Sequence, residues 1–130
     1  MMTRVAFAAV ALFATACTSP AETSDRKAEA DACAQLALTA ANSVSELAFA
    51  RIERMKVMRF ASEEAMKAYT DETDRLSMEA IRMDNVIVSL SERYGRPGIE
   101  LDPDLAEDPT DELAAAAIEA ADACAAPLLT

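Results

Sequence analysis

The chain has 130 residues and a formal net charge of −11, because 23 acidic side chains outnumber 12 basic ones. A chain of this length forms a single domain, and its acidity excludes nucleic acid as a partner, since the phosphates would repel it. It contains no histidine and only two glycines, so it lacks the usual catalytic base and a glycine-rich phosphate-binding loop. We therefore expect neither an enzyme nor a cofactor.

Residues 1–16 have the composition of an export signal. A single positive charge, Arg4, precedes twelve apolar and small residues at positions 5–16. This run is too short to span a bilayer, which needs about 20 residues. The segment therefore predicts a signal peptide that directs the chain out of the cytoplasm.

The end of this segment resembles the lipobox of bacterial lipoproteins, in which small residues come directly before a cysteine. Here the residues are Ala14, Thr15 and Ala16, followed by Cys17, so the resemblance covers only the first 17 residues, and Ala14 stands where that class usually has leucine. It implies that the signal peptide is removed and that Cys17 is acylated. The protein would then be anchored to the membrane of the bacterial cell envelope, facing the periplasm. The same residues also fit ordinary signal cleavage, which would leave a secreted or soluble periplasmic protein, and an uncleaved anchor is a third alternative.

The three cysteines of the chain are Cys17, Cys33 and Cys124. Exported proteins meet an oxidising compartment, where thiols are expected in pairs, and an odd thiol needs an explanation. If Cys17 is acylated, Cys33 and Cys124 remain as a disulfide pair. The alternative is two buried free thiols in an alanine-rich core.

Two long helices are predicted after a short tether. Residues 17–24 are small and polar with one proline, which predicts a flexible tether. The next seventy residues, 25–94, contain neither glycine nor proline and are rich in residues that lose little on entering a helix. One unbroken helix would be about 105 Å long at 1.5 Å per residue. We expect a break at 60–62, where a serine caps the second helix, and hence helices over about 25–60 and 63–94.

The second of these helices carries an apolar seam whose spacing alternates between three and four residues, typical of a helix that packs lengthwise against another. The same heptad spacing continues backwards through the first helix, so that a fold about 60–61 opposes Met83 with Leu38 and Tyr69 with Ile52. The seam positions of the first helix are Ala34, Leu38, Ala41, Ser45, Ala48, Ile52 and Met55. This favours an antiparallel hairpin. The same heptad spacing also fits one continuous helix in a two-chain coiled coil, and this alternative stays open. The seam consists of Met66, Tyr69, Thr73, Leu76, Ala80, Met83, Ile87, Leu90 and Tyr94.

The second helix is expected to end at Tyr94 and Gly95, because glycine accepts a left-handed conformation and Pro97 blocks continuation. Residues 95–109 predict an acidic loop that contains prolines. A shorter third helix then covers about 110–125.

The third helix has a thin apolar face that begins at Leu113 and ends at Cys124. Laid antiparallel on the first helix, this face puts Leu113 opposite Leu47 and Cys124 opposite Cys33. A disulfide that closes about ninety residues stabilises by about 4–5 kcal/mol in the chain-entropy model. The sequence therefore predicts an all-α fold: a long antiparallel helical hairpin with a shorter third helix, which together form a three-helix bundle at the base of the hairpin, closed by a disulfide.

The far end of this hairpin is left uncovered, and apolar side chains gather there. Methionine is frequent among them, and its flexible, polarizable side chain suits a surface that accepts varied partners. The alternative is that these residues fill the two-helix core or form a self-association contact. The candidate partner-binding residues are Phe49, Met55, Val57, Met58, Phe60, Met66 and Tyr69.

Two weaker patterns concern cations. Met55 and Met58 form an M-x-x-M step, whose thioethers would prefer a soft metal such as Cu(I). The loop carries carboxylates that suit a hard cation such as Ca²⁺, but Glu107 stands where an EF-hand loop starting at Asp102 requires glycine. A solvated acidic loop is the simpler interpretation, and we assign no metal site. The weak candidates for metal ligands are Asp102, Asp104, Glu107 and Asp108.

Together these patterns predict a non-enzymatic, exported and lipid-anchored envelope protein. We expect it to act as a helical module that binds a protein partner or a second copy of itself, with the membrane as its other partner. The alternative function is a periplasmic cation-binding protein that uses the acidic loop or the methionines.

Overall fold

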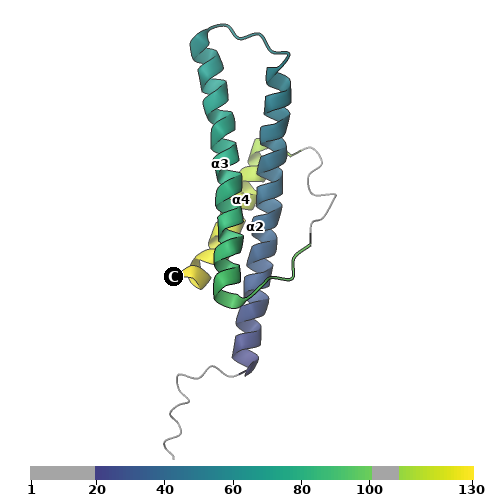
Figure 1. The fold of residues 1–130 in the computed structure, drawn as a ribbon, viewed down its shortest axis with the longest axis vertical. Coiled ribbons are helices and arrows are strands. Elements are labelled where there is room, and N and C mark those ends of the chain that lie inside the picture. The colour runs from purple at the N-terminus through teal and green to yellow at the C-terminus, as the bar shows by residue number, and fades with distance from the viewer. Residues whose placement is uncertain (1–19, 101–108) are drawn as a thin grey trace, which may run out of the picture.

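The structure, a computed structural model, describes residues 20–100 and 109–130, and every regular element in this part of the chain is a helix (Figure 1). The helices are α2 (Pro20–Met55), α3 (Glu63–Tyr94) and α4 (Asp111–Leu129). The first two form a long antiparallel hairpin, and α4 lies along the half of the hairpin that is far from its turn. The predicted all-α hairpin with a three-helix base is confirmed.

Helix α2 begins earlier than the sequence predicts. Its first residue is Pro20, so residues 20–24, which were expected to belong to the flexible tether, are helical. Proline fits the first turn of a helix, because an N–H at that position has no intrahelical partner to lose.

The other end of α2 comes earlier than predicted, at Met55 instead of residue 60, because the last turn tightens. The N–H groups of residues 56–58 donate to carbonyl oxygens three residues back, at 3.3, 3.1 and 3.4 Å, instead of four residues back. Phe60 then turns toward α3 and packs edge-on against Tyr69, with 5.5 Å between the ring centroids. The chain is therefore a hairpin and not one continuous helix.

Helix α3 keeps its predicted bounds because both of its ends are capped. The Ser62 hydroxyl accepts a hydrogen bond from the N–H of Ala65 at 3.0 Å, and acidic side chains occupy the first turn. At the other end Gly95 has a φ of 95°, and its N–H donates to the carbonyl of Ser91 at 2.8 Å. A residue with a Cβ would be strained at this φ.

The core between the helices is built from small side chains on α2 and larger ones on α3. Leu76, Met83 and Leu90 of α3 are buried, with exposed fractions of 3 % or less. On α2, the predicted seam residues Ser45 and Ile52 are exposed. The seam prediction is wrong at these two positions because both line an open groove at the outer edge of the contact between α2 and α3. The alanine stripe of α2, which packs against both α3 and α4, lies on the buried side. The buried alanines of α2 are Ala30, Ala34, Ala37, Ala40, Ala41 and Ala48.

The predicted disulfide closes the base. Cys33 and Cys124 are bonded, with 5.4 Å between their Cα atoms. The buried side of α4 is rotated relative to the prediction, because Leu113 is 61 % exposed and does not face Leu47. The residues of α4 that are buried instead are Ala114, Ala121, Ala125 and Leu128.

Helix α4 also runs past its predicted end near residue 125, although Pro127 lies inside it. A proline in the last turn removes one backbone hydrogen bond, and contacts of the next residue offset this loss. Leu128 is buried in the core at the base. Its carbonyl oxygen accepts hydrogen bonds from the Tyr94 hydroxyl and from Nη1 of Arg93, both at 2.8 Å.

The start of the loop after α3 is tied to α2. Residues 95–100 are not helical, and Nζ of Lys27 donates to the carbonyl of Arg96 at 2.9 Å. The side-chain amide of Gln35 donates to the carbonyl of Glu100 at 2.8 Å and accepts from its N–H at 3.0 Å. These bonds hold the loop against the side of α2.

Candidate functional site

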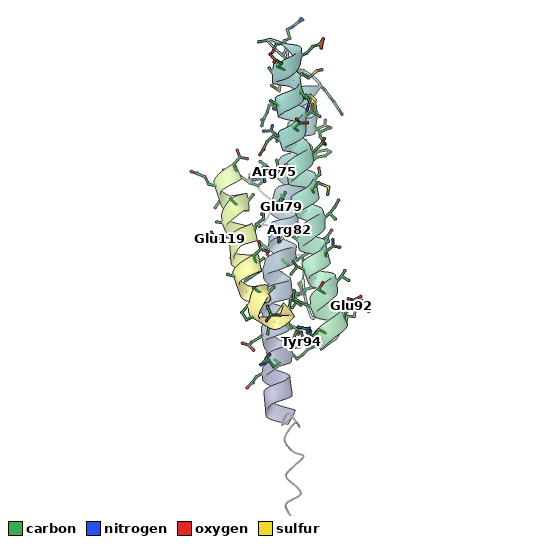
Figure 2. All side chains as sticks on the ribbon, turned by 90° about the vertical axis from the view of Figure 1, so that its left-hand side faces the viewer. Arg75, Glu79, Arg82, Glu92, Tyr94 and Glu119 are labelled. Atoms are coloured by element: carbon green, nitrogen blue, oxygen red, sulfur yellow. A yellow bond between two sulfur atoms is a disulfide. The ribbon has the colours of Figure 1, made fainter. Side chains whose placement is uncertain are left out.

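All seven candidate partner-binding residues lie at the closed end of the hairpin, which we call the tip and define as residues 49–69. It comprises the end of α2, the turn and the start of α3, and its upper part extends beyond α4 in both views (Figures 1 and 2). The structure divides the seven residues into those that pack inside the tip and those that stay exposed.

Tyr69 belongs to the first group, because it locks the two helices together with Arg51. The guanidinium carbon of Arg51 lies 4.0 Å from the centroid of the Tyr69 ring, and the Tyr69 hydroxyl donates to the carbonyl of Arg51 at 3.0 Å. Nε of Arg51 also donates to the hydroxyl of the buried Thr73 at 2.9 Å. This bond satisfies the only polar residue of the predicted seam. Arg51 was not among the residues predicted from the sequence, although the register that pairs Ile52 with Tyr69 places Arg51 close to this tyrosine.

The remaining tip residues differ in accessibility. Met55, Met58 and Phe60 are partly buried, and the Met55 sulfur lies 3.9 Å from the hydroxyl oxygen of Thr70. Three others are exposed: Phe49 by 60 %, Val57 by 82 % and Met66 by 46 %. A partner would therefore meet Val57 first, while the partly buried residues support the turn behind it.

A second apolar surface, which we call the open face, runs from the tip along the hairpin and consists of Phe49, Ile52, Ile81 and Val88. The first three line a shallow groove of about 340 Å³ between α2 and α3, whose floor is made by alanines. Val88 follows Ile81 by seven residues and so lies on the same side of α3. Both are 52 % exposed. Neither residue was predicted from the sequence to belong to a binding surface, although their spacing of seven indicates a second apolar stripe on this helix.

The tip differs in charge from the rest of the chain. Residues 49–69 carry five cationic and three acidic side chains, a balance of +2, whereas the remaining residues carry seven cations and twenty acids. At the turn, Lys56 and Arg59 are exposed on either side of Val57 and Met58. The apolar tip is therefore a basic end on an acidic body, which the net charge of the whole chain conceals.

A groove of about 560 Å³ lies on the other side of α3, between α3 and α4. Figure 2 shows Arg75, Glu79 and Arg82 along this groove. Nη1 of Arg82 lies 2.8 Å from Oδ1 of Asp122 on α4, and its Nε lies 2.9 Å from Oε2 of Glu79. Arg75 pairs in the same way with Glu72, at 2.7 Å.

These ion pairs determine what the α3–α4 groove can do. The hydrogen bond from Arg82 lowers the pKa of the Glu79 carboxyl, and the hydrogen bond from Arg75 lowers the pKa of Glu72 in the same way. A carboxyl with a lowered pKa stays ionised near neutral pH and makes a poor general acid. Of these ion pairs, the one between Arg82 and Asp122 ties α4 to α3.

The candidates for cation binding are placed only in part. Asp102, Asp104, Glu107 and Asp108 lie outside the described residues. Within residues 20–100 and 109–130, no group of three or more acidic, cysteine or histidine side chains is arranged to hold a metal ion.

The predicted signal peptide, 1–16, and the acylation site, Cys17, also lie outside the described residues. None of the helices in the described part of the chain combines the length and the hydrophobicity that crossing a membrane requires. Comparisons of the chain with protein-family models, with curated proteins and with solved structures found no match. The surfaces described above are therefore the basis for proposing a function.

Proposed function

We propose that this chain is a non-enzymatic, exported protein of the bacterial cell envelope that is anchored through an acylated Cys17 and acts by binding. Its partner is a protein or a second copy of the chain, and its binding surface is the tip together with the open face. The observation that carries the proposal is the exposure of large apolar side chains over both surfaces, led by Val57 at the turn and Phe49 where the two surfaces meet.

Large apolar side chains that are contiguous on a surface mark interaction sites in soluble proteins. Phe49 and Ile52 lie on one side of the groove and Ile81 lies on the other, so these residues form one patch and not scattered exposures. Val57, at the turn, is a separate exposed apolar side chain. A partner that covers the patch would remove from water apolar area that the chain itself leaves exposed, which is the main source of binding free energy.

Binding without catalysis is supported by the lack of histidine and by the pairing of two cysteines. The chain contains no histidine, and Cys33 and Cys124 are joined to each other, so neither is a free nucleophile. The anchor is supported by the lipobox-like end of the signal segment. It is tested by the intact mass of protein from membranes of its own bacterium, which should begin at Cys17 and carry added acyl mass.

The binding surface is tested by site-specific photocrosslinking of the full-length chain in its own bacterium. A photoreactive phenylalanine analogue at Val57 should form a covalent adduct with a protein. The same analogue at Ala120, which is exposed on the outer side of α4, serves as the matched control and should form none. The absence of an adduct at Val57, or equal adducts at both positions, would contradict the proposed binding surface.

A further inference from the structure

The open face is a side of the hairpin on which a further helix can pack. We propose that it is the docking site for an amphipathic helix of a different protein, whose apolar stripe lies in the groove between α2 and α3 and whose flanks carry lysine or arginine. This inference rests on the proposed function and names the chemistry of the partner.

Helix α4 shows how the α2–α3 pair accepts a helix. On one side of the pair, Ala114 of α4 packs in one cluster with Val44 of α2 and Leu76 of α3 (Figure 2). On the other side, no helix in the described part of the chain covers the groove, whose floor is formed by Ala48 and Ala80. A helix placed there would complete a four-helix bundle, in which every helix buries its apolar side against its neighbours.

The apolar side chains of the open face have a spacing that an amphipathic helix matches. Phe49 and Ile52 are three residues apart on α2, and Ile81 and Val88 are seven residues apart on α3, which is about 10 Å at 1.5 Å per residue. Helices that bind in grooves place their anchors at positions i, i+3, i+4 and i+7. A partner helix with large apolar side chains at these positions can therefore contact both rims of the groove.

The open face lacks cations. Residues 28–50 of α2 contain no lysine or arginine, and the cations of α3 between residues 68 and 92 are Arg75 and Arg82. Both of these line the α3–α4 groove, where each is paired with a carboxylate. They therefore lie away from the open face and do not neutralise it.

Carboxylates, in contrast, do lie on this face. Asp84 lines the groove, and Asp74 precedes Ile81 by seven residues and so lies on the same side of α3. Among the described residues, neither carboxylate forms an ion pair. Lysine or arginine beside the apolar stripe of a partner would supply the missing cations, and such complementary charge directs a surface to a specific partner.

The chain itself does not supply a suitable helix to this face. A second copy that paired through its own open face would bring carboxylates against carboxylates without cations between them, and like charges at an interface repel. Residues 101–108 carry four acidic side chains and no cation. Residues 1–16 are the predicted signal peptide, which is removed from the exported protein. The occupant is therefore a segment of a different protein.

The first test is photocrosslinking of the full-length chain in its own bacterium, with the photoreactive phenylalanine analogue in place of Phe49, which is 60 % exposed at the rim of the groove. We expect an adduct with a different protein. Sequencing of the adduct should place the attachment in a segment that has apolar residues at helical spacing, flanked by lysine or arginine.

The other outcomes of this experiment are informative. An adduct of twice the mass of the chain, or attachment to an acidic segment of another protein, would overturn the inference while leaving the proposed function intact. An adduct at Val57 without one at Phe49 would do the same. The absence of adducts at both positions would overturn the inference and the proposed function together.

The second test uses two synthetic amphipathic peptides of equal length, each with a leucine stripe and with flanks of either lysine or glutamate. In the purified full-length chain with the analogue at Phe49, the lysine peptide should crosslink about tenfold more than the glutamate peptide. Asp74→Asn together with Asp84→Asn should lower the yield of the lysine peptide by about threefold, because exposed ion pairs have modest effects. Equal yields of the two peptides would overturn the inference.

Matched variants separate docking on the open face from general attraction to an acidic chain. Glu29→Gln together with Glu119→Gln removes the same charge from exposed positions outside the open face and should leave the yield unchanged. Equal losses in the two charge variants would overturn the inference.

A further pair of variants tests the apolar contact. Ile81→Ser together with Val88→Ser should lower the yield of the lysine peptide about tenfold, because a few apolar anchors carry most of the binding free energy. Leu113→Ser removes a side chain of similar exposure from α4, 61 % against 52 %, and should leave the yield unchanged. All three residues are more than half exposed, so the melting temperature of each variant should stay close to that of the parent. An unchanged yield in the double variant would overturn the inference.

Discussion

Removing the Cys33–Cys124 disulfide should release α4 from the hairpin. The bonded residues are 91 positions apart, and closing a loop of that length stabilises by about 4–5 kcal/mol in the chain-entropy model. The apolar side chains that α4 buries are three alanines and Leu128. Their burial contributes about 4 kcal/mol, from roughly 0.8 for each methyl group and 2 for the leucine. The covalent bond therefore contributes about as much to holding α4 as its four fully buried apolar side chains together.

The variant is Cys33→Ala with Cys124→Ala, and the assay combines urea unfolding with amide hydrogen exchange. We expect the free energy of unfolding to fall by about 4 kcal/mol. Amides of α4 should exchange roughly 1,000-fold faster, because each 1.4 kcal/mol is a factor of ten, whereas amides at the centre of α3 should lose less protection. Reduction of the unaltered protein is the matched control, because it breaks the same bond without changing a side chain. A loss below about 1 kcal/mol in both experiments would refute this reasoning, since α4 would then be held by contacts that the burial pattern does not explain.

Three further predictions concern single side chains. Met83→Ala should cost about 3 kcal/mol in urea unfolding because Met83 is fully buried, whereas Met78→Ala, 63 % exposed on the same helix, should cost less than about 0.5 kcal/mol. Arg51→Gln should cost about 2 kcal/mol, because a buried hydroxyl loses its charged donor; a cost near zero would contradict the lock between the helices. The lowered pKa of Glu79 gives stability that is present above the ordinary pKa of the carboxyl and is lost as pH falls through the lowered value. Arg82→Gln should remove this part of the pH dependence. Thermal melts over a series of pH values should show a loss of less than about 1 kcal/mol in the free energy of unfolding, because the pair is partly exposed.

The limits of the sequence prediction follow from what each residue type signals. Helix α3 was predicted closely because its signals are strong: a serine cap, a glycine at the end and a regular apolar seam of large side chains. The face of α4 was placed wrongly at Leu113 because alanines occur on nearly every side of this helix, and alanine gives little contrast between a buried and an exposed face. The predicted seam of α2 fails at Ser45 and Ile52, whereas its alanines, Ala34, Ala41 and Ala48, are buried as expected.

The tip could be predicted in composition but not in detail. The spacing of Met55, Val57 and Phe60 places apolar residues near a turn, and nothing local shows that Phe60 turns inward onto Tyr69 while Val57 points outward. That choice depends on contacts across the hairpin, which form only when the two helices are side by side. The charge of the tip was available in the sequence, because a local count shows a basic segment in an acidic chain.

The exposure of the open face follows from how the core is built. Small side chains allow helices to approach closely, and the six buried alanines of α2 leave little volume between the helices for large side chains. Leu76, Met83 and Leu90 fill that volume, so Phe49 and Ile81 have no place inside a single copy. Exposed large apolar residues favour aggregation unless something covers them or charge keeps molecules apart. The net charge of −11 keeps random contacts infrequent, and a partner that places cations beside the acidic face can still approach. The alanine core and the acidic surface therefore support the same interpretation, that the large apolar residues of this hairpin are held outside for a specific contact.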